Sequence, residues 1–338
     1  MSQIIPQNPE QLHLSWQKEL ASVVTDPKIL LSMLDITPEH YQAHFAARKL
    51  FPVRVPKPFI QKMKKGDIND PLLKQVMPLS AEYQELDGYF SDPLAEHDTV
   101  AEGLLHKYKN RVLMIVKAGC AVNCRYCFRR HFPYADNSPN KQRWQPALDY
   151  IQQHPEINEV IFSGGDPLMA SDEHLTWLVN AVEQIPHIKR LRIHSRLPVV
   201  IPNRVTAELV NLLSRSRLIT SMVLHINHAN EIDEALINAI KPLLNANIRL
   251  FNQSVLLKGI NDNAETLSQL SETLFDHGIQ PYYLHVLDKV QGAAHFDLDE
   301  NTAIKIYQEL MANVSGYLVP KLVREIAGEA NKTPLNLT

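Results

Sequence analysis

From about residue 111 onward, short apolar runs alternate with longer amphipathic segments. The runs are rich in branched aliphatic residues and have the length of buried strands, whereas the segments repeat their apolar positions at helical spacing. The predicted strands are Arg111–Lys117, Glu159–Ser163, Arg190–His194, Ser221–Ile226, Arg249–Ser254 and Tyr282–Val286. The predicted helices are Pro146–His154, Ser171–Ile185, Thr206–Ser214, Glu231–Leu244, Ala264–His277 and Asn301–Val314.

Such strand–helix pairs in succession predict a parallel sheet that closes, or partly closes, into a barrel. The expected fold class is therefore α/β, with a partial (βα)6 barrel of the TIM type. A further apolar stretch at Tyr317–Val323 is expected to add an edge strand.

The N-terminal part of the chain shows a different pattern. Helical spacing covers Pro9–Val24 and Asp26–Leu34, and a proline-rich stretch follows at residues 51–59. We therefore expect three parts, which are a helical N-terminal region at residues 1–105, the barrel at 106–315 and a short C-terminal segment at 316–338.

Charge and hydropathy narrow the classes of partner. The 338 residues carry a formal net charge of −3, which gives no electrostatic reason to expect nucleic acid or an anionic membrane as a partner. The N-terminus lacks the basic and apolar regions of a secretory signal, and no apolar run reaches the roughly 18 residues of a membrane span. A cytoplasmic protein with a small, buried substrate is the resulting expectation.

All three cysteines of the chain, Cys120, Cys124 and Cys127, lie close together, which is typical of a metal site. Three thiolates can hold three irons of a cubane iron–sulfur cluster and leave the fourth iron open, whereas ferredoxin-type carriers use four cysteines. An open iron indicates chemistry rather than electron storage. A zinc site completed by His131, or three unrelated thiols, are the alternatives.

Polar motifs follow the predicted strands at the ends where a barrel carries its function. In βα barrels, the loops after the strands build the active site. The cysteine loop follows the first predicted strand, and Ser163-Gly-Gly-Asp166 follows the second. The later strands are followed by Ser195-Arg196, His225 to His228, Gln253-Ser254 and Asp288. We therefore expect these side chains to meet at one end of the barrel.

The spacing C-x3-C-x2-C, with Tyr126 before the last cysteine, resembles the radical S-adenosylmethionine (SAM) superfamily. The resemblance implies a radical SAM core with a [4Fe–4S] cluster, whose open iron binds SAM and whose reduction cleaves SAM to a 5′-deoxyadenosyl radical. It also implies that Ser163, Gly164, Gly165 and Asp166 bind SAM. A tight turn at the two glycines and a helix cap at the aspartate are the alternatives.

Further motifs narrow the resemblance to the lysine 2,3-aminomutase family, whose members also use pyridoxal 5′-phosphate (PLP). It covers nearly the whole chain from about residue 80 onward. The matching motifs are Cys-x3-Cys-x-Tyr-Cys-x-Arg-Arg, Ser163-Gly-Gly-Asp-Pro-Leu168, Arg192-Ile-His-Ser-Arg-x-Pro-Val-Val200, His225-x-Asn-His228, Asn252-Gln-Ser-Val-Leu-Leu257, Gly259-x-Asn-Asp262, Tyr282-Tyr-Leu-His-x-x-Asp288, His295-Phe296 and Lys332-Thr-Pro334. The resemblance implies that Lys332 binds PLP covalently, which makes the C-terminal segment a PLP-binding segment.

The same resemblance assigns roles to further residues. Arg129 is expected to bind the α-carboxylate of the substrate, and Asp288 and Glu325 are expected to face the distal ammonium of lysine. Glu325 stands where the lysine enzymes usually carry aspartate. Arg196 is a candidate for the PLP phosphate, and Gln253 is a candidate for contact with SAM or PLP. For the arginines, a surface ion pair is the alternative.

The function implied by the resemblance is that of an isomerase, a lysine 2,3-aminomutase that converts L-α-lysine to β-lysine with the R configuration. The short C-terminal part and the loop Ala327-Gly-Glu-Ala-Asn-Lys332 resemble the branch that supplies β-lysine for modification of elongation factor P. The implied partners are a flavodoxin- or ferredoxin-type electron donor, elongation factor P and its lysyl-transferring ligase. A 2,3-aminomutase acting on glutamate or arginine, and a metal-binding adaptor protein without catalysis, are the alternatives.

Overall fold

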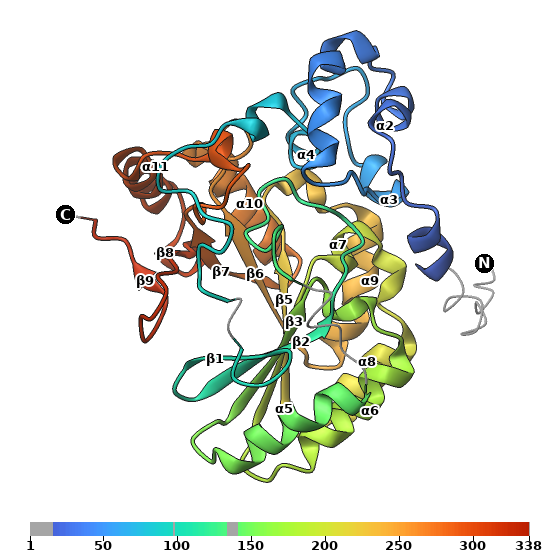
Figure 1. The fold of residues 1–338 in the computed structure, drawn as a ribbon, viewed down its shortest axis with the longest axis vertical. Coiled ribbons are helices and arrows are strands. Elements are labelled where there is room, and N and C mark those ends of the chain that lie inside the picture. Colours follow the sequence, from blue (N-terminus) through green and yellow to red (C-terminus); the bar gives the residue numbers. More distant parts are fainter. Residues whose placement is uncertain (1–15, 97–98, 134–140, 338) are drawn as a thin grey trace.

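The computed structural model describes residues 16–96, 99–133 and 141–337 (Figure 1). At its centre lies one sheet, whose nine strands follow each other in chain order. The parallel strands are β2 (Arg111–Lys117), β3 (Glu159–Gly164), β4 (Arg190–Ser195), β5 (Ile219–His225), β6 (Arg249–Val255), β7 (Ile279–His285) and β8 (Lys321–Arg324), which pairs with β7. The two edge strands are antiparallel to their neighbours: β1 (Leu104–Tyr108) pairs with β2, and β9 (Thr333–Pro334) pairs with β8. No pairing joins β1 to β9 in the described part of the chain, so the barrel is partial.

All six predicted strands are confirmed, and β2 has the predicted bounds. The predicted edge strand is displaced, because its first residues form a 3-10 turn at Gly316–Leu318 and β8 begins only at Lys321. This strand starts directly after Pro320, and proline cannot donate to a strand ladder. β1 and β9 were not predicted.

The six predicted helices are also confirmed, although the first begins before Pro146. They are α5 (Lys141–Gln153), α6 (Asp172–Glu183), α8 (Ala207–Arg215), α9 (Glu234–Asn245), α10 (Ala264–Asp276) and α11 (Glu300–Asn313). The last five of these helices each begin after a polar residue whose side chain accepts a hydrogen bond from the N–H three residues later, which stabilises the first turn. These capping residues are Ser171, Thr206, Asp233, Asn263 and Asp299.

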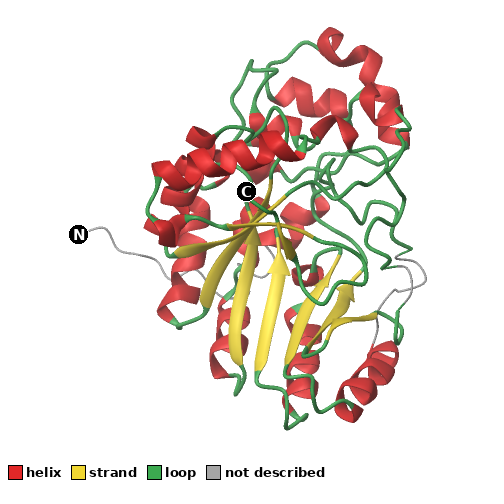
Figure 2. Ribbon diagram, turned by 90° about the vertical axis from the view of Figure 1, so that its left-hand side faces the viewer, coloured by secondary structure: helices red, strands yellow, loops and turns green. Residues whose placement is uncertain are grey.

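The sheet is curved, and helices cover its outer face (Figure 2). Side chains of a strand point alternately to the two faces. On β4, Leu191 and Ile193 are buried in the hydrophobic core, whereas Arg192 and His194 line a cavity. The alternation along the strand therefore separates the residues that hold the fold from those available for chemistry.

The N-terminal region lies over the end of the barrel to which the strand arrows point (Figures 1 and 2). Its helix α2 confirms the segment predicted at Asp26–Leu34, and Asp26 accepts from the N–H of Lys28 at its start. Of the segment predicted at Pro9–Val24, residues 9–15 lie outside the described residues, and 16–21 are helical. After residues 16–21, the region continues with the helices α2 (Pro27–Met33), α3 (Lys57–Ile60) and α4 (Pro71–Lys74) and with 3-10 segments at Pro38–Lys49 and Ser80–Tyr83.

Short elements complete the loops at the same end of the barrel. They are α7 (Leu197–Val200) and 3-10 turns at Pro167–Met169, Pro202–Arg204, Ala229–Glu231 and Ala294–Phe296. Across the described residues, no helix combines the length and the apolar character that crossing a membrane requires. The division of the chain at residues 105 and 315 stays a prediction.

Candidate active site

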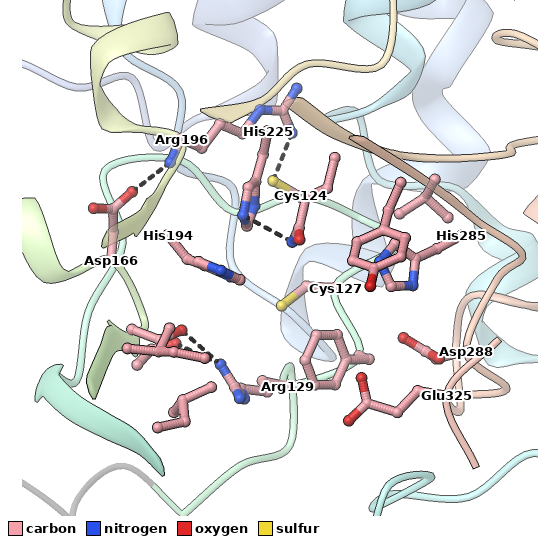
Figure 3. Close-up of a pocket in the computed structure, with 18 of the residues that line it drawn as sticks. Cys124, Cys127, Arg129, Asp166, His194, Arg196, His225, His285, Asp288 and Glu325 are labelled. Atoms are coloured by element: carbon pink, nitrogen blue, oxygen red, sulfur yellow. Dashed lines mark hydrogen bonds between the residues drawn. The ribbon is translucent and has the colours of Figure 1, made fainter. Parts of the chain in front are cut away.

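A cavity of about 230 Å³ lies at the C-terminal ends of the parallel strands (Figure 3). Residues far apart in the chain meet there, as expected for a βα barrel. Every predicted site residue lines it, which gives the set Cys120, Cys124, Cys127, Arg129, Ser163, Gly164, Gly165, Asp166, Arg196, Gln253, Asp288, Glu325 and Lys332. His131, the alternative zinc ligand, is exposed, and its Nε2 lies 3.3 Å from the carbonyl oxygen of Gln291.

The cysteine loop is held by the N-terminal region. The backbone N–H of Arg125 donates to the carbonyl oxygen of Gln75 at 2.8 Å. The Arg125 side chain is fully buried, where it forms an ion pair with Glu82, which also pairs with Arg130. Burial raises the pKa of the Cys127 thiol to about 11. A thiol must lose its proton to bind a metal, so a metal bound here would take the place of that proton. The three cysteines line one cavity, and their number and residue type fit the ligand set of a cluster with one open iron.

Gly164 and Gly165 bring the end of β3 against the cysteine loop. The N–H of Gly165 donates to the carbonyl oxygen of Lys117 at 2.8 Å. A Cβ on Gly165 would lie 2.5 Å from the carbonyl oxygen of Gly119, and Gly164 has a φ of +124°. The turn therefore requires glycine at both positions. Contact of this turn with SAM stays a prediction.

Asp166 joins the loops that follow β3 and β4. It is buried and accepts hydrogen bonds from the Ser195 hydroxyl at 2.7 Å and from the N–H groups of Leu168, Arg196 and Leu197 at 2.8 to 3.0 Å. Burial nevertheless raises the pKa of this carboxyl. Because protein groups already donate to both of its oxygens, we infer that Asp166 positions the loops.

Arg196 contacts the cysteine side of the cavity. Its guanidinium donates to Cys124 Sγ at 2.7 Å and to Glu231 Oε2 at 3.0 Å, and it also contacts the Tyr126 hydroxyl and Gln75. Figure 3 places it across the cavity from Asp288 and Glu325. These contacts hold Arg196 at the cysteine side, and its assignment to the PLP phosphate stays a prediction.

Lys332 and its acidic partners form the opposite side. Strands β8 and β9 pair antiparallel, with Arg324 opposite Thr333. Glu325 comes directly after Arg324 and Lys332 directly before Thr333, so the two residues are neighbours across the hairpin. Lys332 Nζ lies 2.5 Å from Glu325 Oε2. Burial would raise the pKa of Glu325, but the charges of Lys332 and Lys107 lower it below its usual range.

Asp288 lies beside Glu325 in Figure 3. Its side chain is half-buried, and desolvation of the carboxyl, together with the negative charge of Glu325, raises its pKa to about 7. The expected pair of carboxylates therefore exists, but its two members differ in charge state near neutral pH.

Arg129 is held by a residue that the sequence analysis missed. Glu96 accepts from Arg129 Nε at 2.5 Å and from its NH2 at 3.1 Å, and Arg129 NH1 donates to Ser163 Oγ at 3.1 Å. Lys107 Nζ lies 2.9 Å from Glu96 Oε1 and 3.0 Å from Glu325 Oε1. No local pattern marks Glu96 or Lys107, which precede the first predicted strand.

Three histidines, the buried His285 and the half-buried His194 and His225, also line the cavity. Burial lowers the pKa of each one, so they are neutral at pH 7. The Gln253 amide lies 2.9 Å from His225 Nε2. Among the described groups, Nε2 of His194 and Nε2 of His285 have no hydrogen-bond partner. Buried polar atoms usually have partners, so these two atoms indicate a ligand in the cavity.

Further cations lie near Lys332. The Lys332 ammonium is 5.8 Å from the centre of the Tyr283 ring, and the positive charges of Arg111 and Arg192 act on the Tyr283 hydroxyl. Both arginines line the cavity. They are therefore further candidates for an anionic group of a bound molecule, although Arg192 Nε also lies 3.0 Å from Glu159 Oε1.

Comparison with known proteins gives concordant matches. Residues 114–270 match the family model described as the Radical SAM superfamily. The chain is 58% identical to L-lysine 2,3-aminomutase of Escherichia coli over 95% of the chain and 94% of that protein. It is 55% identical to L-lysine 2,3-aminomutase of Haemophilus influenzae over 98% of each protein. Identity with L-lysine 2,3-aminomutase of Clostridium subterminale is 34%, over 95% of the chain and 77% of that protein.

Proposed function

Because this chain belongs to the lysine 2,3-aminomutase family of radical SAM enzymes, we propose that it converts L-α-lysine to β-lysine. One observation carries the proposal. The same cavity is lined by the three clustered cysteines and by Lys332 with its two acidic neighbours, Glu325 and Asp288.

The residues present fit the cofactors that the family implies. Cys120, Cys124 and Cys127 would hold a [4Fe–4S] cluster with SAM beside the Gly164–Gly165 turn, and Lys332 would hold PLP. When bound, the cluster and SAM supply a carbon-centred radical, and PLP holds the substrate nitrogen while it changes position. The unpartnered nitrogens of two cavity histidines support a resident polar group.

The side chains of the chain itself bind and orient the substrate. Arg129 is the candidate for the α-carboxylate, and Glu96 and Ser163 hold its guanidinium in place. Asp288 and Glu325 suit the distal ammonium, and the Lys332 ammonium at 2.5 Å from Glu325 marks a position that a cation can take. Apolar residues such as Val122 and Leu287 line the cavity and keep water from the reacting atoms.

The two acidic residues also discriminate between substrates. A neutral or acidic side chain would bring no cation to Asp288 and Glu325, and a site built for a polar partner rejects molecules that lack it. Glutamate is therefore disfavoured relative to lysine. Arginine carries a distal cation as well, so it remains the second candidate, and direct comparison must separate the two.

We further propose that the product has the R configuration and serves the modification of elongation factor P, with a flavodoxin- or ferredoxin-type protein as electron donor. The sequence of the loop Ala327–Lys332, which resembles that branch of the family, supports this proposal.

Anaerobic assay of protein loaded with cluster and PLP tests the reaction. With SAM and a reductant, we expect β-lysine from lysine and much less product from arginine or glutamate, measured by mass spectrometry with chiral separation. Lysyl-modified elongation factor P as an alternative substrate tests whether free lysine is used. A fully loaded protein that makes no β-lysine would contradict the proposed function.

A further inference from the structure

A row of five alternating charges crosses the cavity. From one end to the other it consists of Arg129, Glu96, Lys107, Glu325 and Lys332. The successive nitrogen–oxygen distances are 2.5, 2.9, 3.0 and 2.5 Å. Each inner member therefore contacts two groups of opposite charge.

The row connects the two ends of the proposed substrate site. Arg129 is the candidate for the α-carboxylate, and Glu325, beside Asp288, is the candidate for the distal ammonium. Lys107 carries one positive charge and places it between Glu96 and Glu325. A change of charge at Glu96 therefore alters the electrostatic field at Glu325 through Lys107.

Water screens the charges of Glu96 and Lys107 only weakly. The Glu96 side chain is only 5% exposed, and its backbone N–H donates to Asp92 Oδ1 at 2.9 Å, which fixes its position. The side chain of Lys107 is 23% exposed. Charges that water screens only weakly interact over several ångströms. If Lys107 moves closer to one of its two carboxylates, the electrostatic field at the other carboxylate therefore becomes more negative.

We propose that Glu96 and Lys107 set the selectivity of this site for amino acids with a distal ammonium. This inference rests on the proposed function of Arg129 and Glu325. Glu96 positions the Arg129 guanidinium and draws Lys107 away from Glu325, which leaves Glu325 with negative charge for the substrate. Both Glu96 and Lys107 are positioning residues that act through their neighbours.

Opposite effects follow for the two residues. Without the charge of Glu96, Lys107 neutralises Glu325 more fully, so the site loses preference for a cationic side chain. Without Lys107, the cavity loses a cation that competes for Glu325, so the substrate ammonium meets a more negative field and this preference rises. A purely structural role for either residue would not give effects of opposite sign.

Binding without turnover tests the inference. Wild type, E96Q, K107M and the double variant are loaded with PLP, and SAM is omitted. L-lysine and L-norleucine serve as probes because they differ only in the distal ammonium. Dissociation constants come from the change in PLP absorbance, and the norleucine-to-lysine ratio of these constants measures the selectivity.

A matched control is D172N, which removes a charge from another buried ion pair. Asp172 Oδ1 lies 2.8 Å from Arg204 NH2, and neither residue lines the cavity. This variant is expected to leave the selectivity unchanged.

We expect E96Q to lower the selectivity by about tenfold, since a hydrogen bond to a charged group contributes about 1.5 kcal/mol or more. K107M is expected to raise the selectivity, and the double variant is expected to differ from the product of the single effects. An unchanged selectivity in E96Q, or a shift of the same sign in E96Q and K107M, would overturn the inference. Loss of PLP from K107M would overturn it as well, because Lys107 would then belong to the cofactor site.

The two variants keep the test decisive if one fails to fold, because each has its own expected sign. Failure of the proposed function has a different signature. In that case the wild type itself would form no β-lysine when SAM and reductant are added, whatever the selectivity of the variants.

Discussion

Lys332 Nζ and Glu325 Oε2 face each other at 2.5 Å where β8 and β9 pair. A short loop separates Glu325 from Lys332 in the chain, and the antiparallel pairing of the two strands brings them together again. This relationship explains why a spacing of seven residues in the sequence produces a contact. It also places the candidate PLP lysine within ion-pair distance of a carboxylate.

Replacement of this lysine separates the two cofactor sites. We expect Lys332→Ala to abolish PLP absorbance and activity while the protein keeps about four irons per chain. Lys305→Ala, at an exposed position on α11, is the control and should keep both. Loss of the iron together with PLP would show that Lys332 supports the fold instead.

The binding of lysine should depend on pH through Asp288. Its pKa is raised to about 7, so the carboxyl gains its negative charge only as the pH rises through that value. Affinity for lysine is therefore expected to increase from about pH 6 to about pH 8. Titration of the PLP-loaded protein measures this, and Asp288→Asn should remove the dependence. An affinity for lysine that falls over this range would contradict the expectation.

The glycine turn beside the cysteines is expected to tolerate no side chain. In Gly165→Ala the new Cβ would meet the backbone at Gly119, at 2.5 Å before relaxation. We expect a loss of stability of about 1–3 kcal/mol and a lower iron content, measured by thermal unfolding and iron analysis. Gly316→Ala is a matched control, since nothing lies within 4 Å of its Cβ position. Equal behaviour of the two variants would refute the packing argument.

The phosphate of PLP is expected to depend on Arg111 and Arg192 rather than on Arg196. Loss of a hydrogen bond to a charged group corresponds to about a tenfold to hundredfold weaker binding. We therefore expect Arg111→Met to weaken PLP binding by about this factor. Arg196→Lys should retain PLP but disturb the cysteine loop. Equilibrium dialysis of PLP compares them, and weaker PLP binding in Arg196→Lys alone would instead support the assignment of Arg196.

Sequence patterns predicted those helices and strands whose formation depends mainly on residues close together in the chain. Strand β2 has its expected bounds, and Ser171 and Thr206 cap the helices whose starts they marked. The short strands β1 and β9 escaped prediction, because their stability comes from pairing with β2 and β8 rather than from their own few residues.

The site was predictable where residues follow strands. Cys120 and Asp288 each lie at a strand end, and both line the cavity. Glu96 and Lys107 are different, because their importance comes only from contacts with Arg129 and Glu325, which are remote in the chain. The place of Arg196 at the cysteine side of the cavity has a similar cause, since it depends on contacts with Glu231 and Gln75.

The position of Lys332 on the last hairpin of the sheet affects the order in which the two cofactors can bind during synthesis of the chain. A growing chain presents its three cysteines long before β9 is synthesised, and N-terminal parts generally fold first. We expect the cluster ligands to be available while the PLP lysine does not yet exist, so the two cofactors would be acquired in a fixed order. A chain that stops before β9 should still bind iron but no PLP, and PLP bound by that shortened chain would disprove the order.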